Sequence, residues 1–85
     1  MPGRGVDFTL KFATEMIKVI YALSRVRREV NMSDIVNTLK TDYHVATRYR
    51  KALEELGLIR VRPEGRENRV ELTEKGLCIA KCLLD

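Results

Sequence analysis

The sequence predicts an α+β domain that is mostly helical, and three observations support this. Apolar residues recur every three to four positions in four segments, which is the period of an amphipathic helix. Two shorter segments near residues 60 and 70 alternate apolar and polar residues around a turn-rich stretch, as in a β-hairpin. The 85 residues are 45% hydrophobic and 33% charged, which suits one folded domain.

The first six residues include Pro2, Gly3 and Gly5, so we expect a flexible lead at 1–6 and a single domain at 7–85. A helix is predicted from about residue 8 to residue 27, with Asp7 or Thr9 as its cap. Its apolar positions cover most of its circumference: Phe8, Phe12, Ala13, Met16, Ile17, Val19, Ile20, Tyr21, Leu23 and Val26. Such a helix must be covered on both sides, either by its own domain or by a second copy of the chain.

Residues 33–59 are expected to form two helices joined by a tight polar turn. Ser33 is the predicted cap of the first helix and Asp42 that of the second, which is expected to stop at Gly57. The predicted inward positions are Ile35, Val36 and Leu39 on the first helix and Ala46, Tyr49, Leu53 and Leu56 on the second. Residues 29–31 could add a small strand before this pair.

A β-hairpin is predicted next, with strands at 58–62 and 69–72. Its turn is expected at 63–68, where Gly65 and Asn68 can take positive φ, and Arg66 would lie at the tip. Thr73 is then the predicted cap of a last helix over residues 74–84.

This order of elements is the winged helix-turn-helix architecture. The string ALEELGLIRVRPEGRENRVELTEKG resembles the recognition-helix end, wing and exit of prokaryotic and archaeal transcriptional regulators of the MarR, PadR and ArsR types. Residues 42–49 (DYHVATRY) resemble the start of their recognition helices, so the resemblance covers about residues 33–76. It implies a DNA-binding regulator without naming one family. The chain is shorter than typical MarR members and has no ArsR-like metal-sensing motif, so no effector is expected.

The outward side of the second helix of the pair is the predicted DNA-reading surface, because a helix fits the major groove. Arg48 is the predicted guanine contact, and Arg50 and Lys51 suit phosphates. The full predicted set on this helix is Tyr43, His44, Val45, Thr47, Arg48, Arg50 and Lys51. In the hairpin, Arg66 is the predicted minor-groove or backbone contact, supported by Arg62 and Arg69. The alternative is that these arginines form a solvated surface.

A homodimer is predicted through the first and last helices, with contacts from Phe8, Phe12, Ile17, Tyr21, Cys78 and Cys82. The two cysteines lie four residues apart and so share one helix face. They could be buried apolar residues or form a bridge between two copies. They and the single histidine lack the paired spacing of a zinc site, so no metal is expected.

The net charge of +4 only moderately favours a polyanionic partner. There is no membrane-spanning apolar run and no secretory signal, so a cytoplasmic protein is expected. No P-loop, dinucleotide-binding glycine pattern or nucleophile–base pair appears, which argues against an enzyme. The sequence therefore predicts a transcriptional regulator that binds double-stranded DNA. The rival interpretation is a winged-helix module that binds protein or RNA within a larger assembly.

Overall fold

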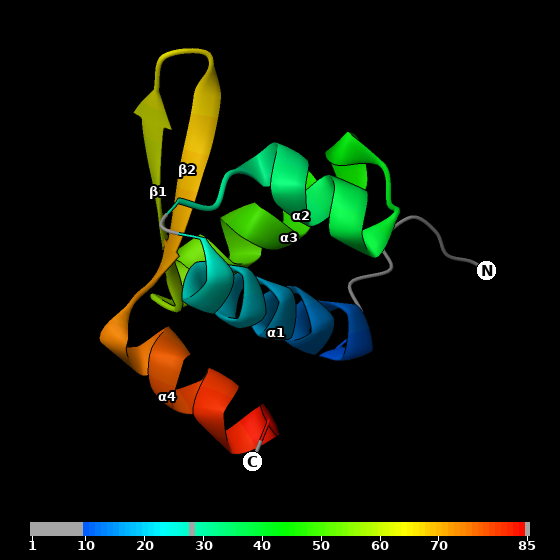
Figure 1. Cartoon of the computed structure of the whole chain (residues 1–85). Coiled ribbons are helices and arrows are strands. Elements are labelled where there is room, and N and C mark those ends of the chain that lie inside the picture. Colours follow the sequence, from blue (N-terminus) through cyan, green and yellow to red (C-terminus); the bar gives the residue numbers. More distant parts are fainter. Residues whose placement is uncertain (1–9, 28, 85) are drawn as a thin grey trace, which may run out of the picture.

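The helix α1 (Leu10–Val26) runs through the middle of the structure, with α2 (Met32–Leu39) and α3 (Tyr43–Glu55) on one side and α4 (Glu74–Leu84) on the other (Figure 1). The strands β1 (Ile59–Glu64) and β2 (Glu67–Leu72) form a hairpin that projects from this helical body. The structure is a computed structural model that describes residues 10–27 and 29–84. The predicted lead at 1–6, the caps Asp7 and Thr9, and Phe8 lie outside these residues. The mostly helical α+β class is confirmed.

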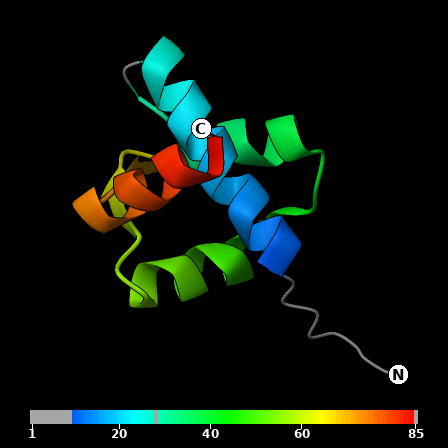
Figure 2. The same ribbon diagram turned by 90° about the horizontal axis from the view of Figure 1, so that it is seen from below.

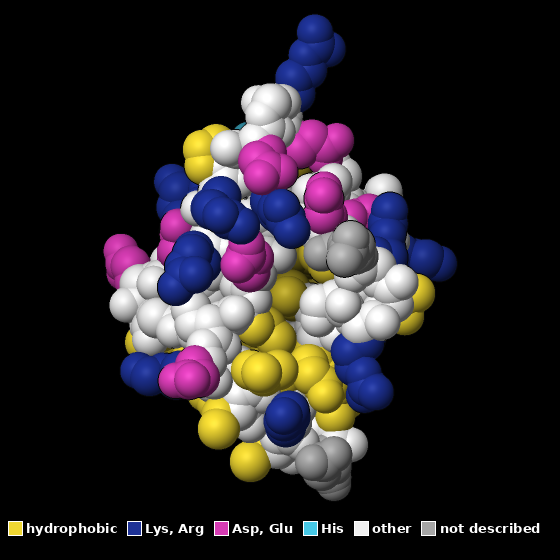
Figure 3. Space-filling view, turned by 60° about the vertical axis from the view of Figure 1, so that its left-hand side comes forward, with side chains coloured by type: hydrophobic (Ala, Val, Ile, Leu, Met, Phe, Trp, Pro, Cys, Tyr) yellow, Lys and Arg dark blue, Asp and Glu magenta, His cyan; other side chains and the backbone are white. Residues whose placement is uncertain are grey.

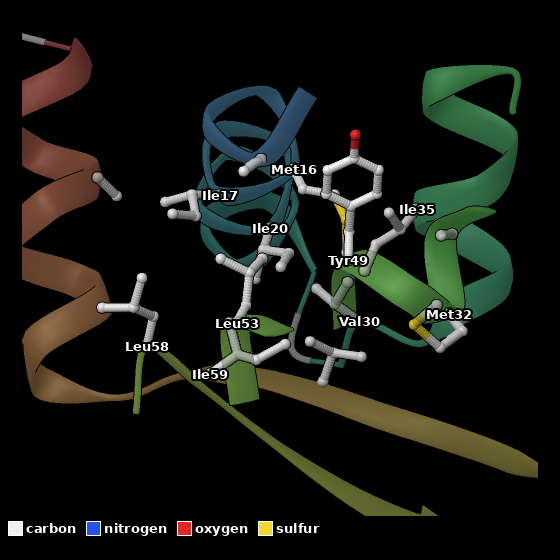
Figure 4. Close-up of a cluster of buried hydrophobic side chains, with 14 residues drawn as sticks. Met16, Ile17, Ile20, Val30, Met32, Ile35, Tyr49, Leu53, Leu58 and Ile59 are labelled. Atoms are coloured by element: carbon white, nitrogen blue, oxygen red, sulfur yellow. The ribbon is translucent and has the colours of Figure 1, made fainter. Parts of the chain in front are cut away.

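The core lies where α1, α3 and the start of β1 meet. Met16, Ile20 and Leu53 are at most 2% exposed, and their side chains point toward one another (Figure 4). The inward positions predicted for α3 are confirmed at Ala46, Tyr49 and Leu53, all buried. Two predicted core residues are wrong: Val26 is 82% exposed and Leu56 is 58% exposed. Val26 is the last residue of α1 and Leu56 follows the last of α3, so neither remains under a neighbouring element. Figure 2 shows α4 crossing the other side of α1.

The cap of α2 is Asn31, so the prediction of Ser33 was wrong. The Asn31 side chain accepts a hydrogen bond from the Asp34 amide at 3.1 Å, and the Asp34 carboxylate accepts one from the Asn31 amide at 3.1 Å. This reciprocal pair is a capping box, which satisfies two amides at once. Asparagine caps as well as serine, and starting the helix at Met32 also buries that side chain.

The small strand predicted at 29–31 is a single bridge. Asn31 pairs with Arg69, and the Val70 amide donates to the Val30 carbonyl at 2.7 Å. These contacts tie the start of α2 to β2, which pairs with β1 on its other side.

The turn between α2 and α3 is set by local chemistry. Lys40 ends α2 in the left-handed region, with φ 54°, and the Thr41 amide donates to the Val36 carbonyl at 3.2 Å. Asp42 then caps α3, as predicted, since its carboxylate accepts a hydrogen bond from the His44 amide at 2.9 Å. The two caps together fix where α3 begins relative to α2.

The hairpin turn is shorter than the sequence predicted. Pro63 pairs with Asn68 and Glu64 with Glu67, so the loop is only Gly65 and Arg66. Gly65 has positive φ (63°), which confirms that part of the prediction, whereas Asn68 does not. Glycine at the first position of a two-residue loop matches the twist of the strands. Pro63 is tolerated inside β1 because both strands of a two-stranded sheet are edges.

The junction of α3, the hairpin and α4 is built from backbone contacts. Gly57 (φ 77°) ends α3, and the amides of Gly57 and Leu58 donate to the carbonyls of Glu54 and Leu53, both at 3.0 Å. This double hydrogen bond is the Schellman motif. Thr73 returns to the same place, because its amide donates to the Leu58 carbonyl at 3.0 Å.

The Thr73 hydroxyl then links two elements. It donates to the Gly57 carbonyl at 2.6 Å and accepts from the Gly76 amide at 3.1 Å, so it caps α4 as predicted. Residues 56–59 and 72–76 thus form a single junction, defined by the contacts of Gly57, Leu58, Thr73 and Gly76. These are the segments that carry the resemblance to winged-helix regulators. That junction sets the position of α4 on α1.

Candidate nucleic-acid interface

One side of α3 faces away from the core. Ala46 and Tyr49 are buried on the inner side of α3, so residues on the opposite side of the helix face solvent. Exposed on this side are Tyr43, His44, Val45, Arg48 and Lys51, with Thr47 half-buried. The exposure of these residues agrees with the face that the sequence predicted. The surface combines hydrogen-bonding groups, cations and one apolar side chain, which are the groups that read base edges and phosphates.

Arg50 does not belong to this exposed set. Its side chain is 18% exposed, and its Nη1 donates to the Glu54 carboxylate at 3.0 Å. Because the side chain lies along α3 toward residue 54, most of its charge is compensated within the helix. The ion pair of Arg50 with Glu54 links two successive turns of α3. Of the two predicted phosphate contacts on this helix, only Lys51 is fully exposed.

The wing, which we define as residues 59–72, places its four arginines in three different situations. Arg66 is exposed in the two-residue loop at the tip, and Arg60 is exposed near the base. Arg62 forms an ion pair with Glu71, and Arg69 forms one with Glu64 at 3.4 Å. The sequence analysis grouped Arg62 and Arg69 with Arg66, but the structure separates them from it.

The ion pairs of the wing were not predicted, although the predicted strands already had the observed register. A turn over 63–68 places Arg62 opposite Arg69 and diagonally across from Glu71, as in the structure. The predicted turn contained Glu64, however, which the structure places in β1, where its carboxylate pairs with Arg69. The shorter loop therefore adds the pairs of residues 63 with 68 and 64 with 67 to the hairpin.

The tip of the wing and the start of α3 lie on either side of a shallow cleft of about 240 Å³. Arg66, Glu67 and Asn68 line it on the wing side, and Tyr43, Met32 and Ser33 line it on the helical side. The exposed Arg66 and the amino end of α3 therefore face the same opening. A polymer lying along α3 would pass beside the wing tip.

The residues predicted for a dimer interface are divided by the structure. Ile17 is 3% exposed inside the core of the single chain, which corrects its assignment to an interface. Phe12 is half-buried, and its ring lies 4.4 Å from that of Tyr49. Tyr21 is half-buried, whereas Cys78 and Cys82 are exposed free thiols on α4. The chain itself therefore covers much of α1, and α4 adds three exposed leucines, Leu77, Leu83 and Leu84.

Residues 10–27 and 29–84 contain neither a cluster of metal-binding side chains nor a membrane-spanning helix. These residues hold no group of three or more histidine, cysteine, aspartate or glutamate side chains that could bind a metal ion. Their helices are also too short or too polar to cross a membrane.

Comparisons with known proteins bear on the fold. No protein-family model matches the sequence, and no curated protein does. Among solved structures, AF1382 from Archaeoglobus fulgidus is similar over 91% of this chain and 85% of its own, with a TM-score of 0.84 and 25% identity. MepR, a transcription regulator of the Staphylococcus aureus multidrug efflux pump MepA, is similar over 92% of this chain, with a TM-score of 0.78 and 19% identity.

ZitR from Lactococcus lactis is similar over 99% of this chain, with a TM-score of 0.74 and 21% identity. The chain spans 56% of the length of both MepR and ZitR. A further similar structure is a complex of MepR with DNA, with a TM-score of 0.78 and 17% identity. The element order, the hairpin and these similarities agree with one another. The chain therefore has the winged-helix fold, as its sequence predicted.

Proposed function

We propose that this protein is a transcriptional regulator that binds double-stranded DNA sequence-specifically, with α3 in the major groove and the wing on the backbone or in the minor groove. The observation that carries the proposal is the outward side of α3, which presents Arg48 and Lys51 to solvent and begins at Tyr43, in the cleft that Arg66 also lines. The existence of a complex between DNA and MepR, a protein of this fold, supports DNA binding.

The roles of the residues follow from their positions on α3. Arg48 is exposed in the second turn, where a guanidinium can make two hydrogen bonds to one guanine. Thr47 and Tyr43 offer hydroxyls, and Val45 offers methyl groups that suit thymine. Lys51 lies further along the helix and suits a phosphate. The proposal thus assigns base contacts to the first two turns and backbone contacts to the third.

The proposal is tested by titrating a mixed-sequence duplex in mobility-shift assays over a range of salt concentrations. The parent should bind with strong salt dependence. Arg66→Ala should weaken binding to all sequences alike and reduce the slope of log K against log salt by about 0.9, the value for one lost phosphate contact. Arg66 is exposed at the wing tip and lines the same cleft as Tyr43, so losing its phosphate contact should weaken binding whatever the base sequence.

Lys75→Ala is the matched control, because it removes one exposed positive charge from α4, on the other side of α1 from α3 (Figure 1). Its salt slope should equal that of the parent. An Arg66→Ala protein that binds like the Lys75→Ala protein would contradict the wing assignment. A parent that binds no duplex at low salt would contradict the proposed function itself.

The proposal includes a homodimer formed through α4. The buried positions of α4 are small residues, Gly76 and Ala80. The larger apolar residues of the helix stay partly exposed: Leu77 is 36% exposed, Leu83 38% and Leu84 47%. Figure 3 shows apolar side chains gathered in the lower part of the molecule, below the charged wing. Covering these leucines with a second copy would remove them from water and pair two α3 helices for a two-fold symmetric site.

Leu84→Glu is therefore expected to shift the protein from dimer to monomer, because it places a charge within the covered apolar surface. Sedimentation velocity at several concentrations measures the change. Leu56→Glu is the control, since Leu56 is similarly exposed but follows α3 rather than lying on α4. If the parent sediments as a monomer, or if both variants dissociate equally, α4 is not the interface.

A further inference from the structure

The outer face of the wing carries a charge arrangement that the proposed function does not explain. In the β1–β2 register, Arg62 lies directly opposite Arg69, and Glu64 lies directly opposite Glu67. Like charges directly opposite each other on a sheet are unfavourable. The structure relieves them diagonally, since Arg62 pairs with Glu71 and Arg69 pairs with Glu64. Each of these two arginines is thus ion-paired with a different glutamate, and Glu71 also stands directly opposite Arg60.

The resulting pairs are close but not buried. The Arg62 side chain is 53% exposed and that of Glu71 is 31% exposed, while Arg69 and Glu64 are 26% and 50% exposed. Exposed ion pairs contribute little to folding stability. Their larger effect is on the field outside the protein, because a carboxylate beside a guanidinium cancels most of its attraction for a distant phosphate. Figure 3 shows positive and negative side chains interleaved over the upper part of the molecule.

The contrast with α3 makes the arrangement informative. The wing holds four arginines and three glutamates, which leaves a net charge of +1 over residues 59–72. Over its full length, Tyr43–Glu55, α3 holds Arg48, Arg50 and Lys51 against Glu54 and Glu55, so its net charge is also +1. The two elements differ in where the carboxylates stand. Both glutamates of α3 lie at its carboxyl end, beyond the residues that would read bases, whereas in the wing glutamates stand among the arginines.

We propose that Glu64 and Glu71 are specificity determinants: they keep Arg69 and Arg62 from binding DNA phosphates, so that the wing contacts the duplex only at its tip. This inference rests on the proposed DNA-binding function. Phosphate contacts strengthen binding to every sequence alike, whereas base contacts strengthen binding to one. By withholding two phosphate contacts, the two glutamates lower sequence-independent affinity and leave discrimination to α3.

The test compares Glu71→Gln and Glu64→Gln with the parent on mixed-sequence duplex, again over a range of salt. Each substitution frees one arginine to contact a phosphate. Each should raise affinity roughly tenfold near 0.1 M salt and steepen the salt slope by about 0.9. Glu74→Gln is the matched control: it also adds one unit of positive charge, but on the exposed first turn of α4. Its slope should stay that of the parent.

A double-mutant cycle separates a released arginine from a general change in charge. Arg62→Ala alone should change the affinity less than twofold, because Arg62 makes no phosphate contact in the parent. Added to Glu71→Gln, it should remove the whole gain. Thermal denaturation of each variant establishes that the wing remains folded.

The inference is overturned if Glu71→Gln and Glu64→Gln bind like Glu74→Gln while the parent binds duplex. It is also overturned if Arg62→Ala weakens the parent as much as Arg66→Ala does. If the parent and both glutamine variants bind no duplex at low salt, the proposed function fails together with it.

Discussion

Gly76→Ala is expected to destabilise the protein by about 3 kcal/mol or more, at the upper end of what overpacking a well-packed site costs. A Cβ atom added at Gly76 would lie 1.9 Å from the Leu58 carbonyl oxygen and 2.9 Å from its carbon. These are backbone atoms, and the Leu58 carbonyl already accepts the Thr73 amide at 3.0 Å, so neither side can move without breaking the junction. Replacing glycine by alanine normally stabilises a helix by about 1 kcal/mol, and the clash must exceed that gain.

The measurement is urea and thermal denaturation followed by circular dichroism. Gly65→Ala is the comparison, because no atom lies within 4 Å of a Cβ built there and only the positive φ of 63° is strained. It should cost about 1–2 kcal/mol, the penalty for a left-handed backbone. A Gly76→Ala protein as stable as the parent would mean that α4 does not sit on Leu58 as described.

Arg48→Ala is expected to reduce discrimination between the best DNA site and random DNA by about 5- to 150-fold, which corresponds to the 1–3 kcal/mol of a bidentate base contact. The site would first be selected from a random pool with the parent protein. Competition titrations then give the ratio of affinities for the selected site and for random duplex. Arg48 is exposed on the outward side of α3, next to buried Tyr49, so the substitution leaves the core intact.

Lys51→Ala provides the contrast on the same helix. Lys51 is exposed one turn further along and is assigned to a phosphate, so its loss should weaken both duplexes equally and leave the ratio unchanged. An unchanged ratio for Arg48→Ala would remove it from the base-reading set. Equal losses of discrimination in both variants would indicate that the helix lies differently in the groove.

Local signals in the sequence were enough to predict most of the architecture. Asp42 and Thr73 cap their helices as predicted, and Gly57 ends α3, because each of these depends on hydrogen bonds within a few residues. The inward set on α3 was predicted correctly up to Leu53 because three- and four-residue spacing alone decides which side is buried. The error at Ser33 arose where two good capping residues stand close together, and the capping box with Asp34, three residues after Asn31, was overlooked.

The candidate site was predicted less completely, since which arginines are available depends on partners distant in sequence. The sequence determined that α3 presents a polar and cationic side and that a hairpin with an arginine tip follows it. Only the tertiary structure decided that Arg62 and Arg69 are held by glutamates, because hairpin register brings residues 62 and 71 together. Only the tertiary structure also shows why residue 76 is glycine: a Cβ atom there would clash with the Leu58 carbonyl oxygen. Helix periodicity and capping act between near neighbours and can be read from the chain, whereas ion pairing across strands and close backbone approach exist only once separate elements have met.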